Sequence, residues 1–455
     1  MTNQTTFFLR VMRRLAVSLV LIAFPAQSFA QTAEPERETL LNGLRILYWQ
    51  QPGNPNVLLR LRIHSGAAFD LAGKAGMMAL FSDALFPDRA TREYVADELG
   101  GKLEVTTTFD SIDVTLSGKQ SALERMIDLL RGAVLTTPLD ADTVSRLRAA
   151  RIASLSISSS AAAKADQSIA DRLFGTFPYA HPPEGTAATM AKVDRGDLLL
   201  ARERFLNADN ASLVVMGGVE KPRLMRALRQ LLGPWGKSNV NVPATFRQPT
   251  APDSRVFLVD TPGAARAEVR LAVRGLSRSD PDSLAADMLA AIVRQRWQDA
   301  VPELSNASVQ HRAYLLPGIF VFSGSVPTAS ASKAIAAAQT IMRSASQTAP
   351  TEGEVREARA EILSRNTKEI SQPEGLAKMW LDVDTFKLSR RPNAIAGFVS
   401  AIEASDIQRV AARLLKDQPV ATVVVGNSEE LKSAFAGKLD TGAAASGPAV
   451  QIKKP

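Results

Sequence analysis

The chain has 455 residues, with 54 lysines and arginines, 46 aspartates and glutamates, and a formal net charge of +8 at pH 7. It contains no cysteine, which excludes disulfide bonds, a lipoprotein anchor and any thiolate-bound metal. The basic residues are spread among acidic ones, without a Lys/Arg run or interleaved aromatic residues, so we expect no nucleic-acid partner. The length exceeds what one ordinary hydrophobic core organises and predicts at least two domains.

The first residues of the chain have the pattern of an export signal. The basic leader MTNQTTFFLRVMRR is followed by the apolar run LAVSLVLIAF, and Ser28 and Ala30 occupy the small-residue positions of a cleavage site. The apolar run is shorter than the roughly 20 residues that span a bilayer. We therefore predict a signal peptide over 1–30, a mature chain without a membrane span, and a periplasmic location. An N-terminal membrane anchor is the alternative.

Strand and helix patterns follow in an order that occurs twice. In the first half, strand patterns at 39–64 precede the compact apolar helix GKAGMMALFSDALF, and the half ends in the strand NASLVVMGG followed by a helix. In the second half, the strands RVFLVD and AEVRLAVRG precede further helices and a final strand, PVATVVVG. This duplication predicts an α+β fold of two homologous domains, each a mixed or antiparallel sheet packed with helices.

Shifts in composition place the expected domain boundaries. The interval 236–254 is rich in Pro, Asn and Gln and breaks the periodicity, so we read it as a linker. It separates an N-terminal domain at 31–235 from a C-terminal domain at 255–436. The tail at 437–455 is of low complexity, and we expect it to be disordered.

Four passages carry a more specific signal than a strand or helix pattern: HSGAAFDLAGKAGMMALFSDALF, FPYAHPPEGTAATM, LLNGLRILYWQ and FLVDTPGAARAEVRLAVRG. Together they resemble the pitrilysin/insulinase family of zinc peptidases, in particular its two-domain, processing-peptidase-like branch. HSGAAFDLAGKAGMMALFSDALF resembles the lead into the family's metal helix, and FPYAHPPEGTAATM resembles its His-Pro-x-x-Gly-Thr passage. LLNGLRILYWQ and FLVDTPGAARAEVRLAVRG are similar to the openings of the family's two domains. The resemblance covers nearly the whole mature chain, and it implies that the two domains face each other as half of a clam-shell chamber.

The metal motif of the family is degenerate in this sequence. Active members carry H-x-x-E-H, in which two histidines on one helix face bind zinc and the glutamate polarises the attacking water. On the helix at 76–86, these three positions fall on Ala79, Ser82 and Asp83. The third ligand is a distant glutamate, but the corresponding stretch 143–165 contains no Asp or Glu. We therefore predict no catalytic residue, no metal ligand and no cofactor in this chain, with zinc only in a partner subunit.

The family also places an arginine and a tyrosine from the second domain on the substrate carbonyl. The segment AIVRQRWQDAVPELSNASV resembles that region and offers Arg294 or Arg296 for the arginine. A small residue near Ala307 stands at the tyrosine position, and Tyr314 lies beyond it. Because this role depends on positioning, we do not expect a displaced tyrosine to fill it.

The chain has three histidines, and no two of them are at ligand spacing. His64 follows a strand pattern, His181 lies in the AHPPEG turn, and His311 lies in QHRAY. We expect them to be surface or hydrogen-bonded histidines. Convergence of these scattered groups in space is what an active peptidase with atypical ligands would require.

The sequence thus predicts a non-catalytic homologue of a zinc metallopeptidase, the inactive subunit that pairs with a zinc-bearing homologue to process peptides in the periplasm. In the family, peptides add to a sheet edge near the metal helix, and the corresponding strand here is 102–109, rich in β-formers. One alternative is an active zinc metalloendopeptidase with atypical ligands. The other is a stand-alone periplasmic peptide-binding scaffold.

Overall fold

The computed structural model describes residues 34–157, 160–238, 246–436 and 439–440. The predicted signal peptide at 1–30 lies outside the described residues, as do part of the predicted linker and most of the predicted tail. Over the described part, no helix has both the length and the apolar character that crossing a bilayer needs.

The first half of the chain forms a six-stranded sheet, sheet A, in the order β1-β2-β6-β3-β5-β4. Its strands are β1 (Glu36–Thr39), β2 (Arg45–Gln50), β3 (Asn56–Ile63), β4 (Leu103–Thr107), β5 (Ile112–Lys119) and β6 (Ala211–Gly217). β2 and β6 run parallel, and the other neighbours are antiparallel. The sequence ASLVVMG makes β6 buried along its whole length, as expected of a strand covered on both faces.

The second half forms a second six-stranded sheet, sheet B, in the order β12-β7-β11-β8-β10-β9. Its strands are β7 (Val256–Asp260), β8 (Arg266–Arg274), β9 (Ser305–Arg312), β10 (Ile319–Pro327), β11 (Ala421–Gly426) and β12 (Leu439–Asp440). β11 is parallel to β7 and antiparallel to β8, as β6 is parallel to β2 and antiparallel to β3.

The two sheets therefore repeat one topology. The order β2-β6-β3-β5-β4 corresponds to β7-β11-β8-β10-β9, with the parallel pair in the same place. This repetition confirms the predicted α+β fold with two similar halves. The expected disorder from residue 437 onward is wrong for Leu439 and Asp440, because they form β12 and the Asp440 carboxylate pairs with Arg172 at 2.8 Å.

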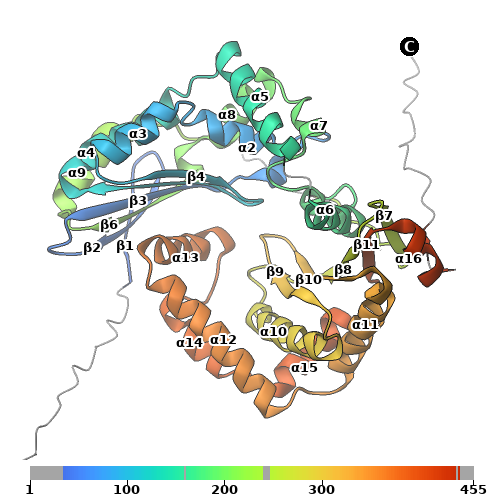
Figure 1. Ribbon diagram of the computed structural model, residues 1–455. Helices are drawn as coiled ribbons and strands as arrows, with labels where there is room; N and C mark the ends of the chain where they lie inside the picture. The colour runs from blue at the N-terminus through green and yellow to red at the C-terminus, as the bar shows by residue number, and fades with distance from the viewer. Residues whose placement is uncertain (1–33, 158–159, 239–245, 437–438, 441–455) are drawn as a thin grey trace, which may run out of the picture. The chain divides into compact units, whose positions relative to one another are not determined.

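Fifteen α-helices are found in the described part. Those of the first half are α2 (Met77–Ala84), α3 (Arg89–Asp97), α4 (Leu123–Leu135), α5 (Ala141–Ile157), α6 (Ala161–Phe174), α7 (Ala187–Met190), α8 (Arg195–Phe205) and α9 (Lys221–Leu231). Those of the second half are α10 (Ser283–Ala300), α11 (Ala331–Gln347), α12 (Glu352–Ile370), α13 (Pro373–Phe386), α14 (Ile395–Ser400), α15 (Ala404–Leu415) and α16 (Ser428–Ala434). Figure 1 shows α3, α4 and α9 over one face of sheet A.

Each sheet has its own core on one face and a helix from the other half on the opposite face. The first core packs sheet A against side chains such as Phe81 of α2 and Leu130 of α4, and the second packs sheet B against α10, α11 and α15. On the opposite faces, α6 of the first half contacts β8 and β11, while α13 of the second half contacts β3 and β6. Trp380 of α13, for example, lies 5.8 Å from the Trp49 ring, between ring centroids.

A buried charge network ties α13 to sheet A. The Arg62 side chain is 3% exposed and forms ion pairs with Asp113 of β5 at 2.7 Å and with Asp382 of α13 at 2.6 Å. Burial alone raises the pKa of Asp113, but the charges of Arg62 and Arg60 outweigh it and hold that pKa well below its usual value. The two halves are therefore joined by ionised groups as well as by apolar packing.

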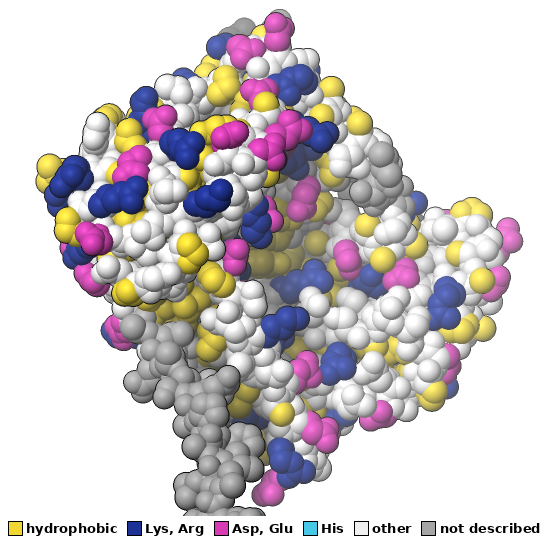
Figure 2. All heavy atoms as spheres, turned by 60° about the vertical axis from the view of Figure 1, so that its left-hand side comes forward, with side chains coloured by type: hydrophobic (Ala, Val, Ile, Leu, Met, Phe, Trp, Pro, Cys, Tyr) yellow, Lys and Arg dark blue, Asp and Glu magenta, His cyan; other side chains and the backbone are white. Residues whose placement is uncertain are grey.

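On the face drawn in Figure 2, Lys and Arg side chains are interspersed with Asp and Glu, and a hollow exposes hydrophobic side chains. The described residues on this face form no continuous basic stripe of the kind that binds a nucleic-acid backbone.

Candidate functional site

The start of α2 is fixed by one buried carboxylate and by two glycines. Asp70 accepts hydrogen bonds from the N–H groups of Gly76 and Met78 at 2.6 and 2.8 Å. Gly76 has a φ of +90°, and a Cβ there would lie 2.6 Å from the carbonyl oxygen of Glu184. A Cβ on Gly185 would lie 2.2 Å from the carbonyl oxygen of Ala75. The AHPPEGT passage therefore packs directly on the start of α2, which only glycines permit.

Two of the three positions that correspond to the metal motif lie inside the protein. Ala79 and Ser82 are 1% and 3% exposed. The Ser82 hydroxyl donates to the Ala79 carbonyl oxygen at 2.7 Å and accepts from the Thr107 hydroxyl at 2.9 Å. These groups hold α2 against β4 and present no metal ligand to a cavity.

The third position, Asp83, is paired with an arginine. Arg151 of α5 donates from Nε to Oδ2 of Asp83 and from Nη2 to Oδ1, both at 2.8 Å. Nη2 also donates to the Ala79 carbonyl oxygen at 3.2 Å. The side chains of Arg151 and Asp83 are 18% and 33% exposed. This two-point pairing of a guanidinium with a carboxylate has the geometry that fixes both groups most firmly.

These residues do not fit a zinc ion. A guanidinium has five N–H donors and no lone pair for a metal, and it neutralises the one carboxylate on the metal helix. Among the described residues, no group of three or more His, Asp or Glu side chains is placed to hold a metal ion. Arg151 lies within 143–165, the stretch that corresponds to the region of the third ligand in the family and that has no Asp or Glu here.

Beside the Asp83–Arg151 pair lies a cavity of about 1190 Å³. Its lining comes from α2, α5 and α6, from the end of β4, from the AHPPEGT passage and from strands β7 and β10 of the second half. Apolar side chains such as Leu147, Leu155, Ile169 and Val321 form much of this lining. A large apolar cavity with a few convergent polar groups is the usual form of a ligand site.

The second half contributes a different arginine from the two that we expected, together with the displaced tyrosine. Arg294 and Arg296 of α10 pair with Glu361 and Glu354 of α12, at 2.9 and 2.6 Å, and neither lines the cavity. Arg312 and Tyr314 do line it, from the end of β9 and the loop that follows. The Tyr314 ring lies 5.0 Å from that of Phe109 and 4.7 Å from that of Tyr179, between centroids.

A buried aspartate next to this aromatic cluster links the two halves. Asp110 accepts from the Tyr179 hydroxyl and from the backbone N–H of Leu315, both at 3.1 Å. The Tyr179 hydroxyl in turn accepts from the N–H of Leu316 at 3.1 Å. Burial raises the pKa of Asp110 to about 6, although these hydrogen bonds favour its charged form.

Strand β4 forms the edge of sheet A near the cavity, and in the described part it pairs only with β5. The Thr108 N–H donates to the Ser111 carbonyl at 2.8 Å, and the Ser117 N–H donates to the Lys102 carbonyl at 3.0 Å. In an antiparallel pair, alternate residues bond to the neighbour, so the N–H and C=O groups of Val105 and Thr107 point away from β5. The predicted strand at 102–109 is therefore an edge strand with free backbone groups.

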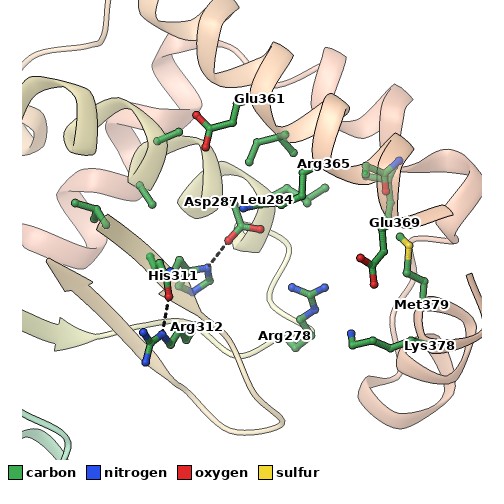
Figure 3. Close-up of a pocket in the computed structure, with 17 residues that line it drawn as sticks. Arg278, Leu284, Asp287, His311, Arg312, Glu361, Arg365, Glu369, Lys378 and Met379 are labelled. Atoms are coloured by element: carbon green, nitrogen blue, oxygen red, sulfur yellow. Dashed lines mark hydrogen bonds and ion pairs between the residues drawn. The ribbon is translucent and has the colours of Figure 1, made fainter. Parts of the chain in front are cut away.

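The three histidines lie in three separate places. His64 hydrogen-bonds to Ser212 at 2.9 Å, and His181 lines the large cavity. His311 lies in a second cavity of about 360 Å³ between α10, β9 and α12, where its Nδ1 is 3.1 Å from Asp287 (Figure 3). The other nitrogen of His311 accepts a backbone N–H, so it is not free for catalysis.

Comparison with known proteins bears on this degenerate site. The sequence model of a family described as Peptidase M16 inactive domain matches residues 192–362. A protease from Helicobacter pylori superimposes on the chain with a TM-score of 0.77 at 15% identity, over 87% of this chain and 100% of that chain. The peptidase M16 inactive domain from Pseudomonas fluorescens gives a TM-score of 0.76 at 17% identity, over 87% and 98%. The resemblance to pitrilysin-type peptidases is confirmed.

The M16-type fold extends to a protein of another kind. A chain of complex III2 from Candida albicans gives a TM-score of 0.73 at 14% identity, over 89% of this chain and 100% of that chain. No curated protein sequence matches the chain. At these identities, the structural likeness establishes the fold, and function has to be argued from the site.

Proposed function

We propose that this chain is a non-catalytic homologue of a zinc metallopeptidase, without a resident metal or other cofactor. The observation that carries the proposal is the two-point ion pair between Arg151 and Asp83. It puts a cation with no lone pair against the helix face that binds zinc in active relatives. The other two positions, Ala79 and Ser82, offer neither an imidazole nor a carboxylate.

We propose further that the cavity and the β4 edge still bind peptide. An extended peptide can add to an exposed sheet edge, where main-chain hydrogen bonds give affinity and alternate side chains enter neighbouring pockets. The outward N–H and C=O groups of Val105 and Thr107 supply such an edge, and Thr107 also lines the apolar cavity. A peptide with apolar side chains is the ligand that this combination fits.

The pairing with a zinc-bearing homologue is the third part of the proposal. The family resemblance implies this pairing. A chain of complex III2 has a similar fold, which supports the idea that proteins of this fold act within larger assemblies. The partner would hold zinc, and this chain would supply the opposing peptide-binding surface. Positioning of this kind is worth several kcal/mol of barrier. The export pattern of residues 1–30 supports a periplasmic setting.

Co-expression with a zinc-bearing homologue from the same genome tests the proposal. We expect a 1:1 complex whose peptidase activity exceeds that of the homologue alone at equal zinc content. Equal activity with and without this chain, together with no co-purification, would contradict the pairing and favour a stand-alone peptide-binding scaffold. Peptide hydrolysis by the purified chain alone, abolished by a chelator, would instead establish a peptidase with atypical ligands.

A further inference from the structure

The guanidinium of Arg151 has a donor group to spare. Its Nε and Nη2 are used by Asp83 and by the Ala79 carbonyl. Nη1 has no hydrogen-bond partner among the described residues. It is not fully buried either, so its lack of a partner leaves no donor sealed inside the protein. Arg151 also lines the large cavity. Nη1 is therefore an unused donor group on a side chain that lines the cavity.

Asp83 holds this donor group in a fixed orientation. Two parallel hydrogen bonds lock the plane of the guanidinium, so little side-chain entropy is lost when Nη1 binds a ligand. Because Asp83 also neutralises most of the positive charge, a free carboxylate gains little net attraction there. The pair suits a neutral, strongly polar acceptor, and a peptide carbonyl oxygen is the acceptor that every peptide carries.

The β4 edge lies next to this donor group. The Thr107 hydroxyl donates to Ser82, the Ser82 hydroxyl donates to the Ala79 carbonyl, and that same carbonyl accepts from Arg151 Nη2. Two hydrogen bonds therefore connect the edge residue to the oxygen that Arg151 contacts. Asp83, Thr107 and Arg151 all line the same cavity. A peptide that pairs with the outer edge of β4 would therefore lie at the cavity that the Arg151 guanidinium also lines.

We infer that Arg151 binds a main-chain carbonyl oxygen of a peptide on the β4 edge, at the place where active relatives use a metal ion. This inference rests on the proposed peptide-binding function. It assigns the chain a metal-free carbonyl-binding group, held by Asp83.

Fluorescence anisotropy with a labelled, C-terminally amidated, unstructured peptide rich in leucine and valine tests the inference. Because a hydrogen bond from a charged donor is lost, we expect Arg151→Gln to weaken binding about tenfold or more. Arg151→Lys should recover part of that loss. Arg148→Gln is the matched control, since Arg148 lies on the same helix but donates to the Val193 carbonyl. Circular dichroism verifies that each variant is folded.

A scan of single thioamide replacements along the peptide separates carbonyl binding from a structural role. Sulfur is a weaker acceptor than oxygen, so one position should lose affinity severalfold with the wild type and lose nothing with Arg151→Gln. Equal losses in both proteins, or equal affinity of both for the parent peptide, would overturn the inference while leaving peptide binding intact. Much tighter binding of a free-acid peptide, lost in the variant, would instead assign Arg151 to a terminal carboxylate. Absence of any binding by the wild type would overturn the proposed function as well.

Discussion

Restoring the motif residues alone should not restore zinc binding. The triple variant Ala79→His, Ser82→Glu and Asp83→His recreates H-x-x-E-H on α2, but it removes the partner of Arg151 and leaves that cation beside the new site. Two unit charges about 4 Å apart interact by about 4 kcal/mol at an effective dielectric constant of about 20. Zn²⁺ carries twice that charge, so the repulsion reaches about 8 kcal/mol, or more than 10⁵-fold in the dissociation constant.

A fourth substitution should reverse this effect. Arg151→Glu in the triple variant replaces the cation with a carboxylate on the side of α5 that faces α2, where a third zinc ligand is needed. Because an arginine side chain can also swing away from the metal, we expect the fourfold variant to bind zinc at least about a thousandfold more tightly than the triple variant. Competition with a zinc-sensitive dye measures both constants.

The control for charge is Arg148→Glu in the same triple background. It makes the same change of charge on α5, but its side chain points to the Val193 carbonyl instead of α2. We expect this control to bind zinc as weakly as the triple variant, and neither should cleave an unstructured peptide. Tight zinc binding by the triple variant, or equal binding by the control and the Arg151→Glu variant, would refute the reasoning. Either result would show that the Arg151 guanidinium does not keep zinc away from α2.

Three further predictions concern stability and the peptide edge. Asp382→Ala leaves the buried Arg62 with one partner fewer, so urea unfolding should show a loss of about 3–5 kcal/mol; a loss below 1 kcal/mol would contradict a tight link between α13 and sheet A. The pKa of Asp110 is raised to about 6 in the folded protein, so its stabilising contribution is complete below about pH 4 and is lost as the pH rises through 6, by about 3 kcal/mol in all. In Asp110→Asn, the urea midpoint should fall less steeply between pH 4 and 7 than in the wild type. The same pH dependence in both proteins would contradict this role of Asp110. Thr107→Pro removes an outward N–H without breaking a bond to β5, so it should weaken peptide binding more than Thr107→Val does. Equal affinities of the two variants would show that the peptide does not bind at the β4 edge.

The sequence was sufficient for the scaffold because its signals are local. The glycines around α2 and in the AHPPEGT passage stand at backbone positions that have no room for a side chain. The structure shows this at Gly76 and Gly185, where a Cβ would lie within 3 Å of a carbonyl oxygen. The repeated strand order likewise followed from local apolar patterns, and both sheets have it. The packing of α6 on sheet B and of α13 on sheet A could not be predicted, since it depends on contacts between segments far apart in the chain.

The composition of the site was harder to predict. The lack of acids over 143–165 was visible, but the arginine that takes their place was not, because α5 carries several arginines and only the packing shows that Arg151 faces α2. Arg312 was not named from the sequence, and Tyr314 was named but not expected to reach the site, although both line the cavity. The register of β9 against β10 decides which residues at the end of β9 reach the cavity, and that register depends on pairing between strands, which a local sequence pattern does not show.

The zinc content of the purified wild-type chain tests the central claim most directly. Elemental analysis after mild dialysis should find far less than one zinc per chain, because Arg151 and Asp83 satisfy each other where active relatives bind the metal. One tightly held zinc per chain, retained through dialysis and lost with peptidase activity on chelation, would contradict the account.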